Sequence, residues 1–130
     1  MKIIYIFSAI LLLNSCIIRR DTGSERNEWT KAFKRSVFIS AVKASYASNK
    51  IAITGNDLSE ALNFEVIGNR KYLKIADSIG KRYSLLIKPS IIRDYDGKRA
   101  IINESLSYYD SKELDSLSGK YYSQYKSERQ

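Results

Sequence analysis

The chain has 130 residues, of which 22 are Lys or Arg and 14 are Asp or Glu, so its formal net charge is +8. It contains no histidine and a single cysteine, Cys16, which excludes Ser-His and Cys-His nucleophilic sites and removes the commonest metal ligand. A chain of this length can form one domain with one apolar core, and its lone cysteine leaves no intramolecular disulfide.

The first 16 residues, MKIIYIFSAILLLNSC, have the features of a secretory signal peptide. Their apolar run is shorter than the roughly 20 residues that a transmembrane helix needs, so we expect residues 1–15 to be a cleaved signal. The segment Leu13–Cys16 resembles the bacterial lipobox, in which cleavage precedes a cysteine that carries lipid. We therefore expect lipid at Cys16 to hold the protein on a bacterial membrane, on the periplasmic side. The alternative is an ordinary signal peptide with an incidental cysteine.

Export changes how the positive charge is interpreted. In a cytosolic protein such an excess favours nucleic acid as the partner, but an exported protein does not meet it. We therefore expect no nucleic acid, and the charge favours an acidic protein partner or an anionic envelope polymer. The alternative is that the charges only solvate helix surfaces.

Residues 16–27 are mostly polar and have no apolar period, which predicts a flexible tether before a single domain over residues 28–130. A first helix is predicted from about Trp29 to Ser48, because apolar and small side chains recur there at steps of three and four. These side chains belong to Trp29, Phe33, Val37, Ser40, Ala41 and Ala44. The following run, Ile51 to Ile53, is too short to assign.

A second helix is predicted from about Leu58 to Ile67. Asp57 and Glu60 have the spacing of a capping box, in which each side chain accepts from a backbone N–H at the start of the helix. Gly68 is a typical residue to follow the last turn.

A third helix is predicted from Arg70 to about Ile87, where Pro89, the only proline, prevents its continuation. Its apolar period is carried by Tyr72, Ala76, Ile79, Tyr83 and Leu86. Gly80 lies inside this helix and costs about 1 kcal/mol relative to alanine. The segment Lys88–Lys98 that follows is the longest predicted loop.

A fourth helix is predicted from about Lys98 to Tyr109, burying Ala100, Ile101, Leu106 and one or both of Tyr108 and Tyr109. Asp110 and Glu113 then have the spacing of a second capping box, which would begin the last helix. The buried side of that helix is predicted to consist of Leu114, Leu117, Tyr121 and Tyr125. With no alternating strand pattern, the sequence predicts an all-α fold, a single compact bundle of about four to five helices.

Few residues are candidates for chemistry. Asp94 and Asp96 flank Tyr95 in the predicted loop and could act as acid and base, but aspartates beside a turn are far more often turn formers. There is no glycine-rich phosphate loop. We therefore expect a binding protein that is not an enzyme, with no catalytic residue, metal or cofactor.

Tyrosine is abundant, with ten copies, and half of them lie between Tyr108 and Tyr125. Tyrosine offers a large contact area with a polar tip, which suits protein interfaces. Tyr108, Tyr109 and Tyr122 are therefore candidate interface residues; the alternative is that they pack between helices.

The run SLSYYDSKELDSL, Ser105 to Leu117, resembles the C-terminal signature of the immunity proteins that neutralise the fourth class of type VI secretion amidase effectors. Upstream, FKRSVFISAVKASY, Phe33 to Tyr46, is similar to the first helix of the same family. The family's two cysteines, which are expected to bond to each other, correspond here to Ala41 and Ser105. Asp110 stands where the family often has histidine. The lipobox is a further departure, because many relatives are soluble in the periplasm.

The resemblance implies an all-helical, commonly dimeric protein that pushes a loop into the catalytic cleft of a papain-like amidase, an enzyme that cuts the peptide stems of peptidoglycan. In this chain we expect the loop Lys88–Lys98 to take that role; its likeliest contacts are Ser90, Arg93, Asp94, Tyr95 and Asp96. An ordinary connection between helices is the alternative for this loop. For the protein, the alternative is an envelope lipoprotein that is not an enzyme and binds peptidoglycan or serves as an adaptor.

Overall fold

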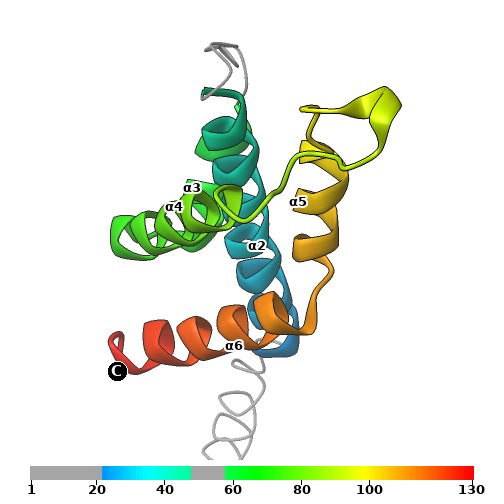
Figure 1. The fold of residues 1–130 in the computed structure, drawn as a ribbon. Coiled ribbons are helices and arrows are strands. Elements are labelled where there is room, and N and C mark those ends of the chain that lie inside the picture. The colour runs from blue at the N-terminus through cyan, green and yellow to red at the C-terminus, as the bar shows by residue number, and fades with distance from the viewer. Residues whose placement is uncertain (1–21, 48–57) are drawn as a thin grey trace, which may run out of the picture.

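A computed structural model describes residues 22–47 and 58–130 of the chain. Within these ranges the fold is all-α, as predicted, and contains five α-helices and one short 3₁₀ helix (Figure 1). They are α2 (Thr22–Ala47), α3 (Ser59–Ile67), α4 (Arg70–Ser84), η2 (Arg93–Tyr95), α5 (Ile101–Tyr109) and α6 (Lys112–Ser127). The predicted signal peptide, Cys16, the first part of the tether and the run Ile51–Ile53 lie outside the described residues.

Helix α2 is the centre of the bundle, since α3, α4, α5 and α6 all pack against it. It ends at Ala47, close to the predicted end at Ser48, but it begins at Thr22. Residues 22–27, which their polar composition assigned to a flexible tether, are therefore helical. The side chain of Glu25 in the first turn binds Lys126 of α6 at 3.1 Å, so α2 contacts α6 beyond its apolar stripe.

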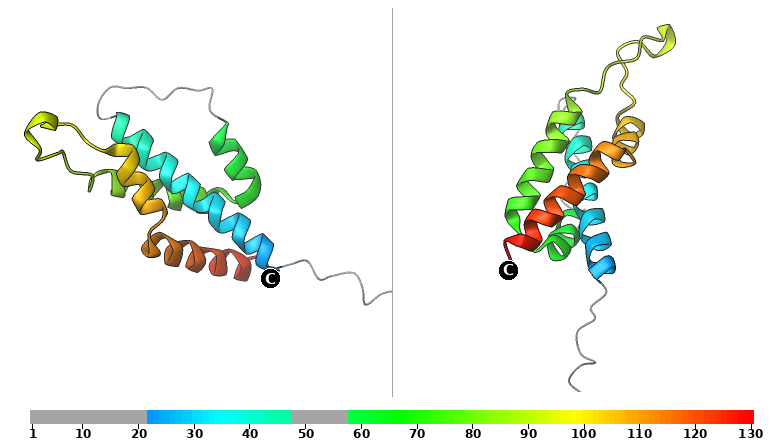
Figure 2. Two further views of the ribbon diagram at one scale, coloured as in Figure 1. Left: turned by 90° about the vertical axis from the view of Figure 1, so that its right-hand side faces the viewer. Right: turned by 90° about the horizontal axis from the view of Figure 1, so that it is seen from below.

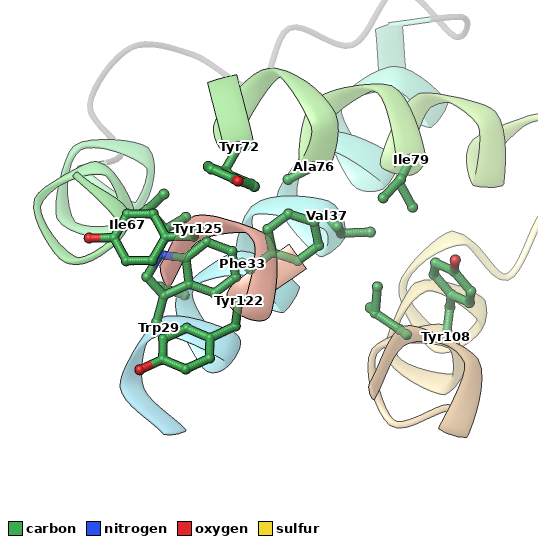
Figure 3. Close-up of a cluster of buried hydrophobic side chains, with 12 residues drawn as sticks. Trp29, Phe33, Val37, Ile67, Tyr72, Ala76, Ile79, Tyr108, Tyr122 and Tyr125 are labelled. Carbon is green, nitrogen blue, oxygen red and sulfur yellow. The ribbon is translucent and has the colours of Figure 1, made fainter. Parts of the chain in front are cut away.

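The core is a cluster of aromatic rings around Trp29 (Figure 3). The Trp29 ring stacks on Phe33 and Tyr125, with centroids 5.5 and 5.3 Å away, and meets the edge of Tyr72 at 5.5 Å. These rings come from α2, α4 and α6, which are distant in sequence. Aromatic pairs at such separations stabilise a core beyond the area they bury.

Gly80 allows α2 and α4 to approach closely. A Cβ atom at position 80 would lie 2.4 Å from the carbonyl oxygen of Val37 and 2.8 Å from the backbone nitrogen of Ala41. Any side chain would therefore push the two helices apart. The glycine, which the propensity argument counted as a cost to the helix, is what this helix pair requires.

Two helix boundaries differ from the prediction. Helix α4 ends at Ser84, three residues early, so Leu86 is exposed while Ile87 remains buried. Helix α5 begins at Ile101 and not at Lys98. Ile101 and Tyr108 are buried. Ala100 is exposed because it precedes α5, and Leu106 is exposed because the buried face of α5 comprises Ile101, Ser105 and Tyr108.

The joint between α5 and α6 uses a different cap from the predicted one. Ser111 is the N-cap of α6, and its hydroxyl oxygen accepts from the backbone N–H of Leu114 at 3.1 Å. Asp110 instead follows the last residue of α5. At α3 the N-cap is Leu58, without a side-chain hydrogen bond, and Asp57 lies outside the described residues.

The burial of the C-terminal tyrosines also differs from the prediction. Tyr108 and Tyr122 are buried and belong to the core, as in the alternative that these rings pack between helices. Tyr109 is half-buried: its ring meets the edge of Phe38 and lies under the ammonium group of Lys34. In α6 the buried face comprises Leu114, Ser118, Tyr122 and Tyr125, while Leu117 and Tyr121 are half-buried.

Candidate functional site

Residues 88–98, called the projecting loop below, extend away from the helices between α4 and α5 (Figures 1 and 2). The loop folds back on itself: the backbone N–H of Ser90 donates to the carbonyl of Lys98 at 2.7 Å, and isolated bridges pair Pro89 with Arg99 and Ser90 with Asp96. A loop with such internal pairing presents its tip in a defined position.

Arg99 fastens the base of the projecting loop to the bundle. Its Nε donates to the carbonyl of Ile87 at 2.9 Å, and a terminal guanidinium nitrogen donates to the carbonyl of Ser84 at 2.5 Å. Ile87 itself is buried. Arg99 thereby satisfies a carbonyl that the end of α4 would leave without a helical partner.

The projecting loop contains the predicted contact residues, which differ in their exposure and hydrogen bonding. Ser90 is half-buried, and its hydroxyl accepts from the backbone N–H of Ile92 at 3.1 Å, so it serves the shape of the loop. Arg93, Asp94 and Asp96 are exposed. Tyr95 ends η2, and its side chain lies outside what the structure describes.

The two aspartates occupy turn positions. Asp94 lies within η2, and Asp96 precedes Gly97, whose φ of +72° is the left-handed conformation that favours glycine. This geometry agrees with the turn-forming interpretation of the pair. Among residues 22–47 and 58–130 there is no group of acidic or cysteine side chains arranged to hold a metal ion.

Sequence reasoning missed the apolar side chains of this region. Leu85, Leu86, Ile91 and Ile92 are 82, 68, 100 and 59% exposed. The sequence places Ile91 and Ile92 in a loop after Pro89, but only the fold shows that no other element of the described chain covers them. Exposed apolar side chains grouped in this way mark an interaction site.

An open groove of about 440 Å³ joins the loop to α5. It is lined by Leu86, Lys88, Pro89, Ser90, Ile91, Ile92, Ala100 and Glu104. Behind it, the hydroxyl of Tyr83 donates to the carbonyl of Glu104 at 3.1 Å, which ties α4 to α5. The loop and groove together form an apolar surface with charged groups at its edge.

A second open groove, of about 390 Å³, continues from Leu86 between α4, α5 and α6. The rings of Tyr83 and Tyr108 stack in it with centroids 4.0 Å apart. Burial, and then the nearby carboxylate of Glu113, raise the pKa of Tyr108 to about 12. Its hydroxyl therefore remains a neutral hydrogen-bond donor at physiological pH.

Comparison with known proteins found no match: no family model, curated protein or solved structure corresponds to this chain. In the part of the chain that the structure describes, none of the helices is both long enough and apolar enough to cross a bilayer.

Proposed function

We propose that the protein is an immunity protein that binds a periplasmic peptidoglycan amidase effector of type VI secretion and occludes its active site. The observation that carries this proposal is the projecting loop, fastened at its base by Arg99 and exposing Ile91 and Ile92 beside a charged turn. Such a body can fill a cleft without performing any bond chemistry. Lipid at Cys16 would keep the inhibitor at the membrane of the cell that it protects.

The loop has the physical properties that occlusion needs. Because Arg99 and the Ser90 backbone already hold its shape, little conformational entropy is lost when it enters a cleft. Ile91 and Ile92 supply apolar area that a cleft can desolvate, and Arg93 supplies an anchor of the kind that dominates interface energies.

The two positions that correspond to the family's cysteines are consistent with the resemblance. Ala41 on α2 and Ser105 on α5 are each 1% exposed, and the two helices pack against each other. The Ser105 hydroxyl has no hydrogen-bond partner among the described residues. A buried position that does not satisfy a hydroxyl suits a less polar side chain, such as the cysteine of the family.

The test is to titrate a cognate amidase with the wild-type protein and with Ile91→Asp and Ile92→Asp variants. Each variant places a charge where an apolar side chain would be buried, so we expect the inhibition constant to rise by more than about tenfold. Leu62→Asp on α3 is the matched control, because Leu62 is 59% exposed, like Ile92, and lies outside the loop. The control should inhibit like the wild type.

Equal inhibition by the loop variants and the control would contradict the proposal. The same experiment tests the other interpretation of the basic composition, an envelope lipoprotein that binds peptidoglycan or serves as an adaptor. Co-sedimentation with purified peptidoglycan, together with no effect on any amidase, would favour that function.

A further inference from the structure

One end of the bundle gathers the start of α2, the start of α4 and the end of α6; we call it the proximal end. Lys126 of α6 binds Glu25 of α2 at 3.1 Å, and Lys71 of α4 binds Glu128 just after α6. The Trp29 cluster lies between these elements. The three helix ends at the proximal end are therefore packed together into one surface.

The projecting loop lies at the opposite end of the molecule (Figure 2). Helix α4 crosses α2 and runs in the same general direction, since Tyr72 meets Trp29 and Gly80 meets Val37 and Ala41 (Figures 1 and 2). The loop follows the C-terminal end of α4. Because α4 has 15 residues, its length of about 22 Å measures the separation between the proximal end and the point at which the loop emerges.

The early start of α2 shortens the distance between Cys16 and the folded domain. Only residues 17–21 separate Cys16 from Thr22, so even a fully extended chain there spans at most about 20 Å. A lipid on Cys16 would hold the proximal end close to the headgroups. The intervening sequence, Ile-Ile-Arg-Arg-Asp, carries a net positive charge of its own.

The proximal end offers guanidinium groups to a phosphate surface. Arg26, Arg70 and Arg129 are exposed, and none is in an ion pair within the described ranges. The guanidinium of Arg129 is positioned by the Tyr125 hydroxyl, to which it donates at 2.5 Å. Glu25 and Glu128 are paired with their lysines, and Glu28 and Glu65, in the last turn of α3, are exposed carboxylates near this end. Guanidinium groups form paired hydrogen bonds with phosphate oxygens.

We propose that the lipidated protein stands on the membrane on its proximal end, with Arg26, Arg70 and Arg129 against lipid phosphates and the projecting loop directed away from the bilayer. This orientation rests on the proposed lipid at Cys16 and is independent of the loop's target. It leaves the loop free for a partner approaching from the periplasm.

The orientation is tested with full-length lipidated protein in vesicles of phosphatidylethanolamine and phosphatidylglycerol. Lipid consumes the only native thiol, so a single introduced cysteine carries a fluorophore: Ser127→Cys at the proximal end or Ile92→Cys at the loop. A quencher attached to lipid headgroups should quench the label at position 127 strongly and the label at position 92 little. Equal quenching, or the reverse order, would overturn the orientation.

A charge variant tests the phosphate contacts. Replacing Arg26, Arg70 and Arg129 with glutamine should reduce quenching at position 127 more on these anionic vesicles than on vesicles of phosphatidylcholine alone, because each phosphate there is paired with a choline cation. The control replaces Lys88, Arg93 and Lys112, which lie outside the proximal end, with glutamine and removes the same charge. Unchanged quenching in the arginine variant would refute the contacts.

Mass spectrometry of the N-terminal peptide separates the two ways in which the inference can fail. Absence of lipid on Cys16 overturns both the anchoring and the orientation. Lipidated protein with equal quenching at both labels overturns the orientation alone. The amidase titration is unaffected by either outcome, because it measures inhibition in solution.

Discussion

Ser111 joins two helices with one hydroxyl group. Its Oγ accepts from the N–H of Leu114 at 3.1 Å and donates to the carbonyl of Tyr108 at 2.7 Å. The first bond satisfies a free donor at the start of α6, and the second adds to the bond that the backbone N–H of Ser111 makes to the same Tyr108 carbonyl at 3.0 Å. The sharp turn between these helices therefore depends on this side chain more than on its acidic neighbour.

Ser111→Ala should lower the free energy of unfolding by about 1–2 kcal/mol, because it removes the cap of α6. Asp110→Ala is the matched control and should cost less, since Asp110 is exposed and makes no side-chain cap to α6. Urea denaturation of both variants measures the difference. A larger loss of unfolding free energy in the Asp110 variant would instead support the capping box that the sequence pattern predicted.

At the scale of the elements, the closest contact is the crossing of α2 and α4. A side chain at position 80 would overlap the backbone of α2, which cannot move without disturbing Val37 and Ala41, both buried. Gly119 in α6 is a different case: a Cβ there would meet only the end of the Arg26 side chain, at 3.3 Å, and that flexible group can turn away.

Gly80→Ala should therefore destabilise the protein by about 2–3 kcal/mol, the usual cost of overpacking. Gly119→Ala should be neutral or stabilise it by up to about 1 kcal/mol, because alanine is the better helix former. Thermal unfolding of the two variants provides the comparison. Similar effects of both substitutions would show that helix propensity, and not the close approach, decides what position 80 tolerates.

The stability of the whole molecule should fall at alkaline pH. Burial, as the largest cause, raises the pKa values of Tyr72, Tyr83 and Tyr108 above 10, that of Tyr108 to about 12. Between about pH 10 and 12 the unfolded chain releases protons that these folded tyrosines retain. Their contribution to stability is complete below pH 10 and is lost as the pH rises through that range.

We expect the free energy of unfolding of the wild type to fall between pH 10 and pH 12. In Tyr108→Phe this fall should be shallower, because the group with the largest shift is gone. Urea denaturation at a series of pH values tests both statements. Parallel curves for the two proteins would mean that Tyr108 does not contribute to the alkaline loss.

Helix content was predictable because it is a local property. The apolar recurrence at steps of three and four identified α2, α4 and α6 from neighbours within a turn. A capping pattern predicted α3, and Gly68 ended it as predicted, with a φ of +65°. Pro89 marked the region of the projecting loop. The all-α class followed from these patterns without knowledge of any long-range contact.

The candidate site was predictable in position but not in chemistry. The charged residues of the loop were recognised because charge in a turn is visible in sequence. Ile91 and Ile92 were missed as contact residues, since exposure depends on whether the rest of the chain reaches them.

The sequence by itself determined where the helices form, that a long loop follows α4 and that histidine chemistry is absent, because each depends on composition or on neighbouring residues. Only the tertiary structure decided which faces are covered. It buried Tyr108 and Tyr122, required glycine at position 80 and began α2 at Thr22. Each of these three features depends on contact with a helix that is distant in the sequence. The periodic pattern of one helix does not specify which other helix packs against its apolar face.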